Sequence, residues 1–85
     1  MSTQNRPGRS AKDKQHLLKI GDNIRTVRKQ RGYSQEEFAD IVGFSRSYYT
    51  EIETGKRNIS VLNLTKIMKA LNVNPNEIIG SIKLK

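Results

Sequence analysis

The sequence contains no cysteine, so neither a disulfide framework nor a thiolate metal site can hold this chain together. No apolar run reaches the roughly 20 residues that a membrane-spanning helix needs, and no signal-peptide pattern opens the chain. These absences predict a soluble, cytoplasmic protein that does not enter a membrane. At 85 residues, the chain is long enough for one small domain with little core to spare.

Residues that catalysis usually requires are also scarce. The single histidine is His16, and the sequence has no glycine-rich phosphate loop and no paired carboxylates in an identifiable cleft. A core of this size is too small to shape a deep pocket. We therefore expect no enzymatic activity and no metal or cofactor, and we interpret His16 as a solvated residue.

Basic residues are present in excess. Sixteen Lys and Arg against eight Asp and Glu give a formal net charge of +8, which attracts a polyphosphate at long range. A well-solvated basic surface would carry the same charge. Residues 1–16 are basic, contain a Pro-Gly pair and have almost nothing apolar, which predicts a flexible, disordered arm. This arm lacks the apolar face by which a helix binds a membrane surface.

After the arm, apolar residues recur with helical spacing. Leu17, Ile20, Ile24 and Val27 follow one another at intervals of three and four residues and so form one stripe of a helix, which Gly32 ends. The whole chain gives about five such helices and no convincing strand. The predicted fold class is therefore all-α.

Capping residues predict where the second and third helices begin. Ser34 and Glu37 have the spacing of a capping box, so a helix should run from about Gln35 to Val42. Ser45 can cap the next helix, and Gly55 ends it.

Similar signals predict the beginnings of two further helices. Ser60 begins a helix whose apolar stripe lies within residues 64–71. Asn74, Pro75 and Glu77 are a cap, a first-turn proline and a third-position glutamate, which together predict a short last helix.

Residues 35–52 describe two short helices that cross tightly. Ala39 is small where the second helix would have to cross close to the first, and Gly43 stands where a chain leaving a helix prefers a left-handed residue. The apolar residues that supply the buried side of both helices are Phe38, Val42, Phe44, Tyr49 and Ile52. Such a unit is a helix-turn-helix, whose known use is to place its second helix in the DNA major groove.

From residue 17 to residue 75 the chain resembles the helix-turn-helix family of phage repressors, Cro proteins and their bacterial relatives. The matching stretches are Ile24-Arg25, Arg28, Gly32, and residues 34–39, 43–45, 52–55 and 64–73. The resemblance implies a compact five-helix, repressor-like domain over residues 17–85 that binds DNA and dimerises.

A narrower resemblance lies within that family. Arg46-Ser47-Tyr48-Tyr49, Ile52-Glu53 and residues 57–60 are similar to the controller proteins of restriction-modification systems. The resemblance implies a regulator that both activates and represses transcription. The chain departs from the family at Tyr49, where Ile or Val is usual, so its hydroxyl must find the edge of the domain or a partner.

The helical wheel of the third helix indicates which side chains read base edges. If Tyr49 and Ile52 face the core, Arg46, Ser47 and Thr50 point away from it and are the predicted base contacts. Arg46 can donate two parallel hydrogen bonds to guanine, and the Thr50 methyl can pack on thymine. The alternatives are a phosphate contact or a solvated side chain at Arg46, and merely small polar residues at the other two positions.

A second group should contact the DNA backbone. The predicted backbone contacts are Gln35, Tyr48, Lys56, Arg57 and Asn58. The resemblance implies the role of Gln35, since the family's equivalent glutamine contacts a phosphate beside free backbone amides at a helix N-terminus. The alternative is that Gln35 is an ordinary helix residue without a role in binding. For Tyr48 the alternative is a half-buried ring packed on the following loop. Glu51 is expected to be peripheral, because phosphates repel it.

One charged pair is interpreted as structural. The family pattern pairs an arginine at the position of Arg28 with a glutamate at the position of Glu53, which ties the first helix to the third. Leaving either partner alone and partly buried would cost several kcal/mol.

The expected function is sequence-specific DNA binding that regulates transcription, including that of the protein's own gene, as the controller of a restriction-modification system. The expected partners are double-stranded DNA, a second copy of the chain and RNA polymerase. The alternatives are a general small repressor of the same family and an antitoxin-like module that holds a protein partner. A partner-binding helix would show apolar anchors on its outer face, whereas the third helix is polar and small there.

The apolar residues near the C-terminus predict a homodimer. Ile78, Ile79, Ile82 and Leu84 are more than the end of so small a domain can readily bury. We expect the three isoleucines to line a two-fold interface that sets the two DNA-reading helices roughly 34 Å apart on a palindromic site. The alternative is that Ile78 and Ile79 fold back onto the first helix.

Overall fold

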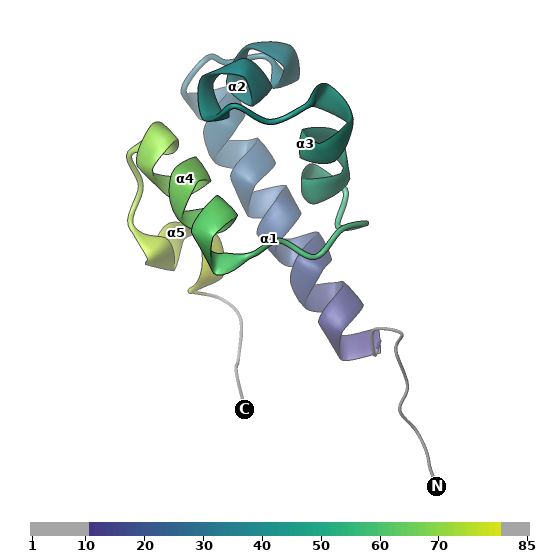
Figure 1. Cartoon of the computed structure of the whole chain (residues 1–85). Helices are drawn as coiled ribbons and strands as arrows, with labels where there is room; N and C mark the ends of the chain where they lie inside the picture. Colours follow the sequence, from purple (N-terminus) through teal and green to yellow (C-terminus); the bar gives the residue numbers. More distant parts are fainter. Residues whose placement is uncertain (1–10, 81–85) are drawn as a thin grey trace, which may run out of the picture.

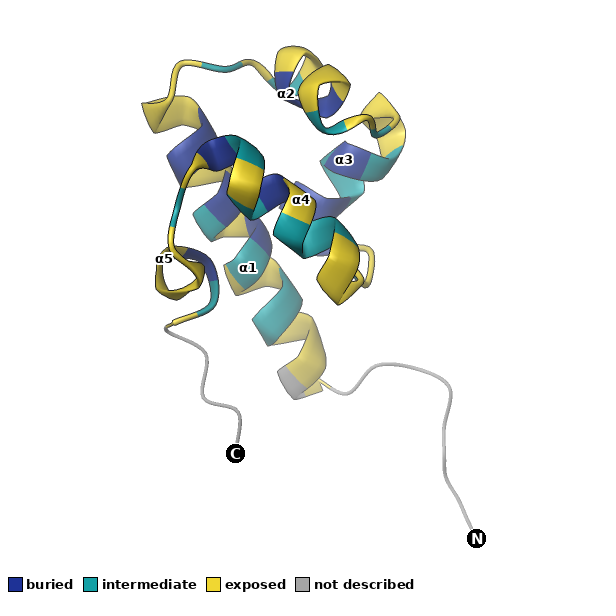
Figure 2. Ribbon diagram, turned by 60° about the vertical axis from the view of Figure 1, so that its left-hand side comes forward, coloured by how far each residue is buried: buried dark blue, intermediate teal, exposed yellow. Residues whose placement is uncertain are grey.

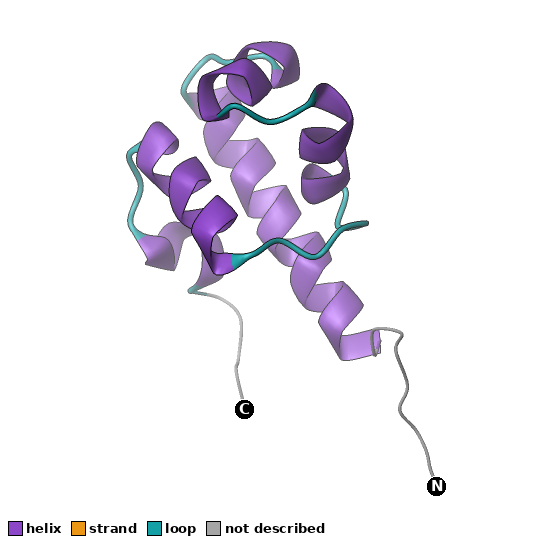
Figure 3. Ribbon diagram, in the orientation of Figure 1, coloured by secondary structure: helices purple, strands orange, loops and turns teal. Residues whose placement is uncertain are grey.

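The computed structural model describes residues 11–80 as helices and connecting loops, without a strand in that range (Figures 1 and 3). The helices are α1 (Ala11–Gln30), α2 (Gln35–Val42), α3 (Arg46–Glu53), α4 (Val61–Leu71) and α5 (Pro75–Ile79). In Figure 1 the long α1 runs behind the others, with α3 to its right and α4 and α5 to its left. The prediction of an all-α, five-helix fold is confirmed. Within residues 11–80 no helix is both long and apolar enough to cross a membrane.

Helix boundaries follow the predicted capping signals. The Ser34 hydroxyl accepts from the Glu37 backbone N–H at 3.0 Å, and the Glu37 carboxylate accepts from the Ser34 N–H at 2.8 Å, so the capping box of α2 is present. Ser45 and Ser60 cap α3 and α4 by accepting from the backbone N–H three residues on. Gly43 ends α2 with a φ of 79°. These interactions are short in range, which is why the sequence predicts them.

The first helix begins earlier than predicted. α1 starts at Ala11, so the assignment of residues 11–16 to a disordered arm is wrong, while residues 1–10 lie outside the described residues. The prediction relied on an apolar stripe that starts only at Leu17, but an exposed turn needs no apolar face to be helical. Alanine, lysine and glutamine are good helix formers, and Asp13 lies in the first turn, where the helix dipole favours a carboxylate.

The core lies where α1 meets the other helices. Its buried hydrophobic members are Ile24, Val27, Phe38, Ala39, Tyr49, Ile52, Ile67, Leu71 and Ile78. α1 packs on α3 and α5, and α2 packs on α3 and α4. Figure 2 shows the buried stretches facing the interior between these helices, with exposed stretches outside. Every helix therefore contributes to one core, which fixes the orientation of α3.

α5 packs against α1 and buries Ile78. This side chain is 0% exposed, and its backbone carbonyl accepts a hydrogen bond from the Asn23 side-chain amide at 2.7 Å. The prediction that Ile78 lines a dimer interface is therefore wrong, because the side chain completes the core of its own domain. Ile79 is half-buried against the same core. Ile82 lies outside the described residues, so the interface roles of Ile79 and Ile82 stay predictions.

Gly21 sets the closest approach between α1 and α3. A Cβ atom at this position would lie 2.4 Å from the carbonyl oxygen of Ile52 and 2.5 Å from that of Glu53. No side chain fits between the two backbones. A glycine in mid-helix costs about 1 kcal/mol relative to alanine, and here it allows α3 to cross directly on α1.

We expect Gly21→Ala to lower the free energy of unfolding by roughly 1–3 kcal/mol, because the added methyl group forces α1 and α3 apart. Helix propensity alone would predict the opposite sign. Urea unfolding measures the change. Lys19→Ala, at an exposed position of the same helix, is the control and should stay within about 0.5 kcal/mol of the parent. A Gly21→Ala variant more stable than the parent would contradict the close crossing.

Candidate nucleic-acid interface

α2 and α3 form the predicted helix-turn-helix. At the turn between them Gly43 adopts a left-handed conformation, and the Phe44 N–H donates to the Ala39 carbonyl at 2.9 Å. Ala39 is buried, which lets α3 cross close to α2. The ring of Phe38 on α2 meets the ring of Tyr49 on α3 edge-on, with centroids 5.5 Å apart. This packing holds α3 in one orientation on the surface.

The outer face of α3 carries polar and mostly small side chains. Arg46 and Ser47 are exposed and Thr50 is half-buried, whereas Tyr49 and Ile52 point into the core. This is the division that the helical wheel predicts. Among residues 11–80, the exposed large apolar side chains are Leu18, Ile41, Val61 and Leu62. None of them lies on α3, so its outer face offers hydrogen-bonding groups and small side chains.

Arg46 projects from the first turn of α3. Its side chain is 61% exposed and lies 3.7 Å from the carboxylate of Glu36, which is 74% exposed. A pair this exposed contributes little to stability, so the guanidinium can exchange Glu36 for another acceptor at small cost. Its five donors suit the paired acceptors of a guanine edge.

The loop between α3 and α4 carries three of the predicted backbone contacts, Lys56, Arg57 and Asn58, all exposed. The Arg57 guanidinium is held in place, because it pairs with Glu51 at 2.8 Å and lies 5.4 Å from the centroid of the Tyr48 ring. Glu51 thus neutralises part of the positive charge beside α3. Since this pair is largely exposed, a phosphate can compete with the carboxylate for Arg57.

Tyr48 contacts the turn before α3 and the first turn of α4. Its ring meets Phe44 edge-on at 5.1 Å between centroids, and its hydroxyl oxygen accepts from the Asn63 side-chain amide at 2.9 Å. The side chain is half-buried, and Arg57 of the following loop lies over its ring, as the alternative interpretation of the sequence predicted. The hydroxyl proton is still available as a donor, so a phosphate contact by Tyr48 stays a prediction.

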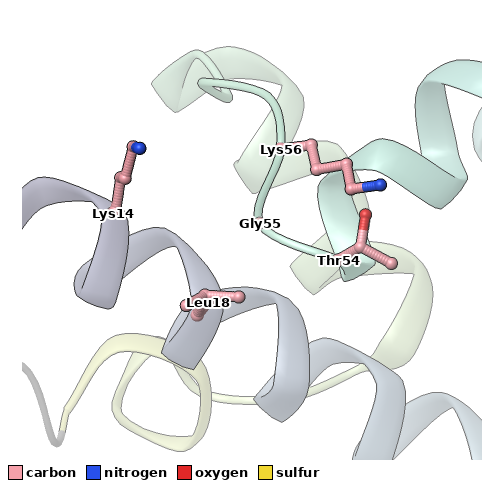
Figure 4. Close-up of a pocket in the computed structure, with 5 residues that line it drawn as sticks. All are labelled: Lys14, Leu18, Thr54, Gly55 and Lys56. Carbon is pink, nitrogen blue, oxygen red and sulfur yellow. The ribbon is translucent and has the colours of Figure 1, made fainter. Parts of the chain in front are cut away.

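An open hollow of about 320 Å³ lies between the first turns of α1 and the loop that follows α3 (Figure 4). Two lysines, Lys14 and Lys56, line it together with Leu18, Thr54 and Gly55. A Cβ atom on Gly55 would lie 2.9 Å from the Leu18 Cα atom, so the loop backbone touches α1 here. Lys14 therefore stands beside the loop and joins the candidate phosphate ligands. The sequence alone did not indicate this placement, because Lys14 precedes the apolar stripe of the first helix and was assigned to the arm.

A buried ion pair lies beneath α3. Arg28 donates from Nε to Glu53 at 2.7 Å and from Nη2 at 3.2 Å, and its Nη1 donates to the Tyr33 carbonyl at 2.7 Å. Arg28 and Glu53 are each 5% exposed. The predicted structural pair is thus present, and it fastens α1 to the end of α3.

Two more donors reach the Glu53 carboxylate. They are the hydroxyl of the fully buried Tyr49 and the side-chain amide of Gln35, the latter at 2.8 Å. Burial alone would raise the pKa of Glu53, but hydrogen bonds from Arg28, Tyr49 and Gln35 outweigh burial and lower it. Burial and the neighbouring carboxylate raise the pKa of Tyr49. The carboxylate therefore stays ionised, the phenol stays neutral, and the Tyr49 hydroxyl has its partner inside the domain.

Comparison with known proteins identifies relatives across most of the chain. Residues 24–78 match the model of a family described as Helix-turn-helix. The chain is 37% identical over 67 residues to the control protein C.MunI of Mycoplasma sp, which covers 78% of this chain and 90% of that protein. It is also 37% identical over 65 residues to the antitoxin PezA of Streptococcus pneumoniae, covering 76% of this chain and 41% of the antitoxin.

Two solved structures of controller proteins share the fold. The restriction-modification controller protein C.AhdI from Aeromonas hydrophila superposes with a TM-score of 0.69 at 40% identity, over 73% of this chain and 94% of that one. The controller protein C.Esp1396I, solved as a tetramer with its natural 35 base-pair operator, superposes with a TM-score of 0.65 at 31% identity, over 79% of this chain and 83% of that one.

Proposed function

The chain belongs to the helix-turn-helix family of DNA-binding transcription regulators, and on this premise we propose that it binds a near-palindromic operator as a homodimer and acts as the controller of a restriction-modification system. The outer face of α3 carries the proposal. Arg46, Ser47 and Thr50 present donors, acceptors and a methyl group there without an apolar anchor. Such a face suits the edges of base pairs in the major groove, which is wide enough for a helix.

The relatives supply the biological context of the proposal. C.MunI is a control protein, and C.Esp1396I assembles as a tetramer on its operator. By analogy, the promoter of the protein's own gene is among its targets, and RNA polymerase is the partner through which it activates transcription. Such a regulator works in the cytoplasm, where the DNA is, and needs no catalytic residues.

The antitoxin-like alternative fits the outer face of α3 less well. A helix that holds a protein partner buries apolar or aromatic anchors at the centre of the contact. The large apolar side chains exposed within residues 11–80 lie on α1, α2 and α4 instead. We therefore favour DNA over a protein ligand for α3.

Selection of bound duplexes from a randomised pool tests the operator proposal. We expect a near-palindromic consensus whose two half-sites are centred about one helical turn apart, roughly 10 base pairs or a multiple of that. A guanine is expected in each half-site as the partner of Arg46. A single unpaired half-site, or no consensus at all, would contradict the dimeric operator.

Two apolar surfaces are available for the second copy. One is Ile79 on α5, half-buried in the isolated domain. The other is the first turn of α4, where Val61 is 81% exposed and Leu62 is 66% exposed. α4 begins close to α3, because Asn63 donates to the Tyr48 hydroxyl. A two-fold contact through this turn would therefore keep the two copies of α3 near each other.

We expect the wild type to sediment as a dimer at a protein concentration of tens of micromolar, which is on the order of the dissociation constant of a weak dimer. Leu62→Asp and Ile79→Asp each place a charge on one candidate surface, and the variant that becomes monomeric identifies the interface. Ile41→Asp, at an exposed apolar position on α2, is the matched control and should leave the dimer intact. A wild type that stays monomeric at this concentration would remove the dimer from the proposal.

A further inference from the structure

Gln35 connects the buried ion pair to the outer face of α3. Its side-chain Nε2 donates to Glu53 at 2.8 Å, and its Oε1 accepts from the Thr50 hydroxyl at 3.3 Å. Glu53 is buried and Thr50 is half-buried. One amide group thus spans the distance from the core to a predicted base contact.

Glu53 determines which way the amide of Gln35 points. The carboxylate is ionised and already accepts from Arg28 and Tyr49, so it can take only a donor from Gln35. Turning the amide over would place its carbonyl oxygen against a buried negative charge, which is strongly unfavourable. The carbonyl oxygen of Gln35 must therefore face Thr50.

The fixed amide in turn limits Thr50. Its hydroxyl has to donate to Gln35, because the atom it meets is an acceptor. A threonine in a helix divides between two rotamers, since its hydroxyl can also bond a backbone carbonyl three or four residues earlier. The bond to Gln35 selects one rotamer. Thr50 then presents its methyl group and the remaining acceptor lone pairs to a ligand, and no donor.

We propose that Gln35 is a positioning residue for base recognition, which turns Thr50 into a reader of adenine–thymine pairs. In the major groove this pair offers a thymine methyl group and an adenine amino donor, whereas a guanine–cytosine pair offers an amino donor on cytosine but no methyl group, and guanine itself offers only acceptors. A Thr50 that presents its methyl group therefore favours the thymine methyl group of an adenine–thymine pair, and its lack of a spare donor disfavours a guanine edge. The inference rests on the proposed reading of DNA by α3 and adds a specific base-pair preference to it.

The test measures relative affinities for duplexes that carry each of the four base pairs at every operator position. Thr50→Ala identifies the position that Thr50 contacts, as the one where discrimination changes. Gln35→Met keeps the length of the side chain and removes both hydrogen bonds. We expect it to reduce the adenine–thymine preference at that same position roughly tenfold, which corresponds to the net contribution of about one hydrogen bond. Discrimination at the guanine read by Arg46 should stay unchanged.

A second variant separates the methyl group from the hydroxyl. Thr50→Val keeps the shape and the methyl group without a hydroxyl that could turn, so it should retain most of the thymine preference in the presence or absence of Gln35. If Gln35→Met instead weakened binding to all duplexes equally, Gln35 would be a phosphate contact or a structural residue and the inference would be wrong. If the wild type showed no sequence preference at any position, the DNA-reading role of α3 itself would fail.

Discussion

Arg28→Ala is expected to lower the free energy of unfolding by roughly 3–5 kcal/mol, because it leaves the carboxylate of Glu53 buried without its main partner. Two hydrogen bonds to Glu53 and one to the Tyr33 carbonyl disappear with the guanidinium. Tyr49 and Gln35 still donate to the carboxylate, but they carry no positive charge. In a domain of this size such a loss is a large share of the total stability.

An exposed pair on the same helix provides the control. Arg25 pairs with Asp22 at 2.8 Å, with side chains that are 48% and 57% exposed, so Arg25→Ala should change stability by about 0.5 kcal/mol or less. Urea unfolding measures both variants, and operator titration at a temperature where each is folded measures DNA binding. An Arg28→Ala variant that unfolds like the parent but no longer binds the operator would show that Arg28 contacts DNA.

Arg46→Ala is expected to abolish discrimination at one base pair, at a cost of about 1–3 kcal/mol for the preferred sequence. The guanidinium stands at the exposed start of α3, where, among the described residues 11–80, a weak contact to Glu36 holds it. The affinity for unrelated DNA should fall much less. That affinity comes from electrostatic attraction to phosphates, and losing one positive charge among many changes this attraction only slightly. The folded state should keep its stability, since the side chain is exposed.

Arg57→Ala is the matched comparison, because it removes the same charge from the loop after α3. We expect it to weaken binding to all sequences alike and to reduce the salt dependence by about one phosphate contact. Competition titrations with operator duplexes that differ at single base pairs distinguish the two variants. Equal losses for specific and unrelated DNA in Arg46→Ala would make Arg46 a phosphate ligand.

Local signals in the sequence were enough to place most of the helices. Ser34, Ser45 and Ser60 each cap a helix through an atom three residues away, and Gly43 turns the chain through its own φ. None of these features needs a distant partner. The buried pair of Arg28 and Glu53 is different, because its residues lie 25 positions apart, and only the family resemblance connected them.

Features that depend on tertiary packing were missed or misjudged. Whether Ile78 faces its own core or a second copy depends on how α5 docks on α1, and hydrophobicity alone does not decide between them. In the sequence, Gly21 indicates only a residue of low helix propensity within a helix. Its role becomes clear only in the fold, where α3 crosses α1 at this position. The bonds of Gln35 to Glu53 and Thr50 arise from three separate segments. The DNA contacts predicted for α3 and the following loop remain predictions, since they concern a complex.

The most direct test of the account is a titration of the full chain with a duplex carrying the selected operator and with a scrambled duplex of the same composition, at several salt concentrations. We predict tighter binding to the operator at every salt concentration. Both affinities should fall steeply with salt, by a factor set by the number of phosphates neutralised. Equal affinity for the two duplexes would contradict the conclusion that α3 reads DNA sequence.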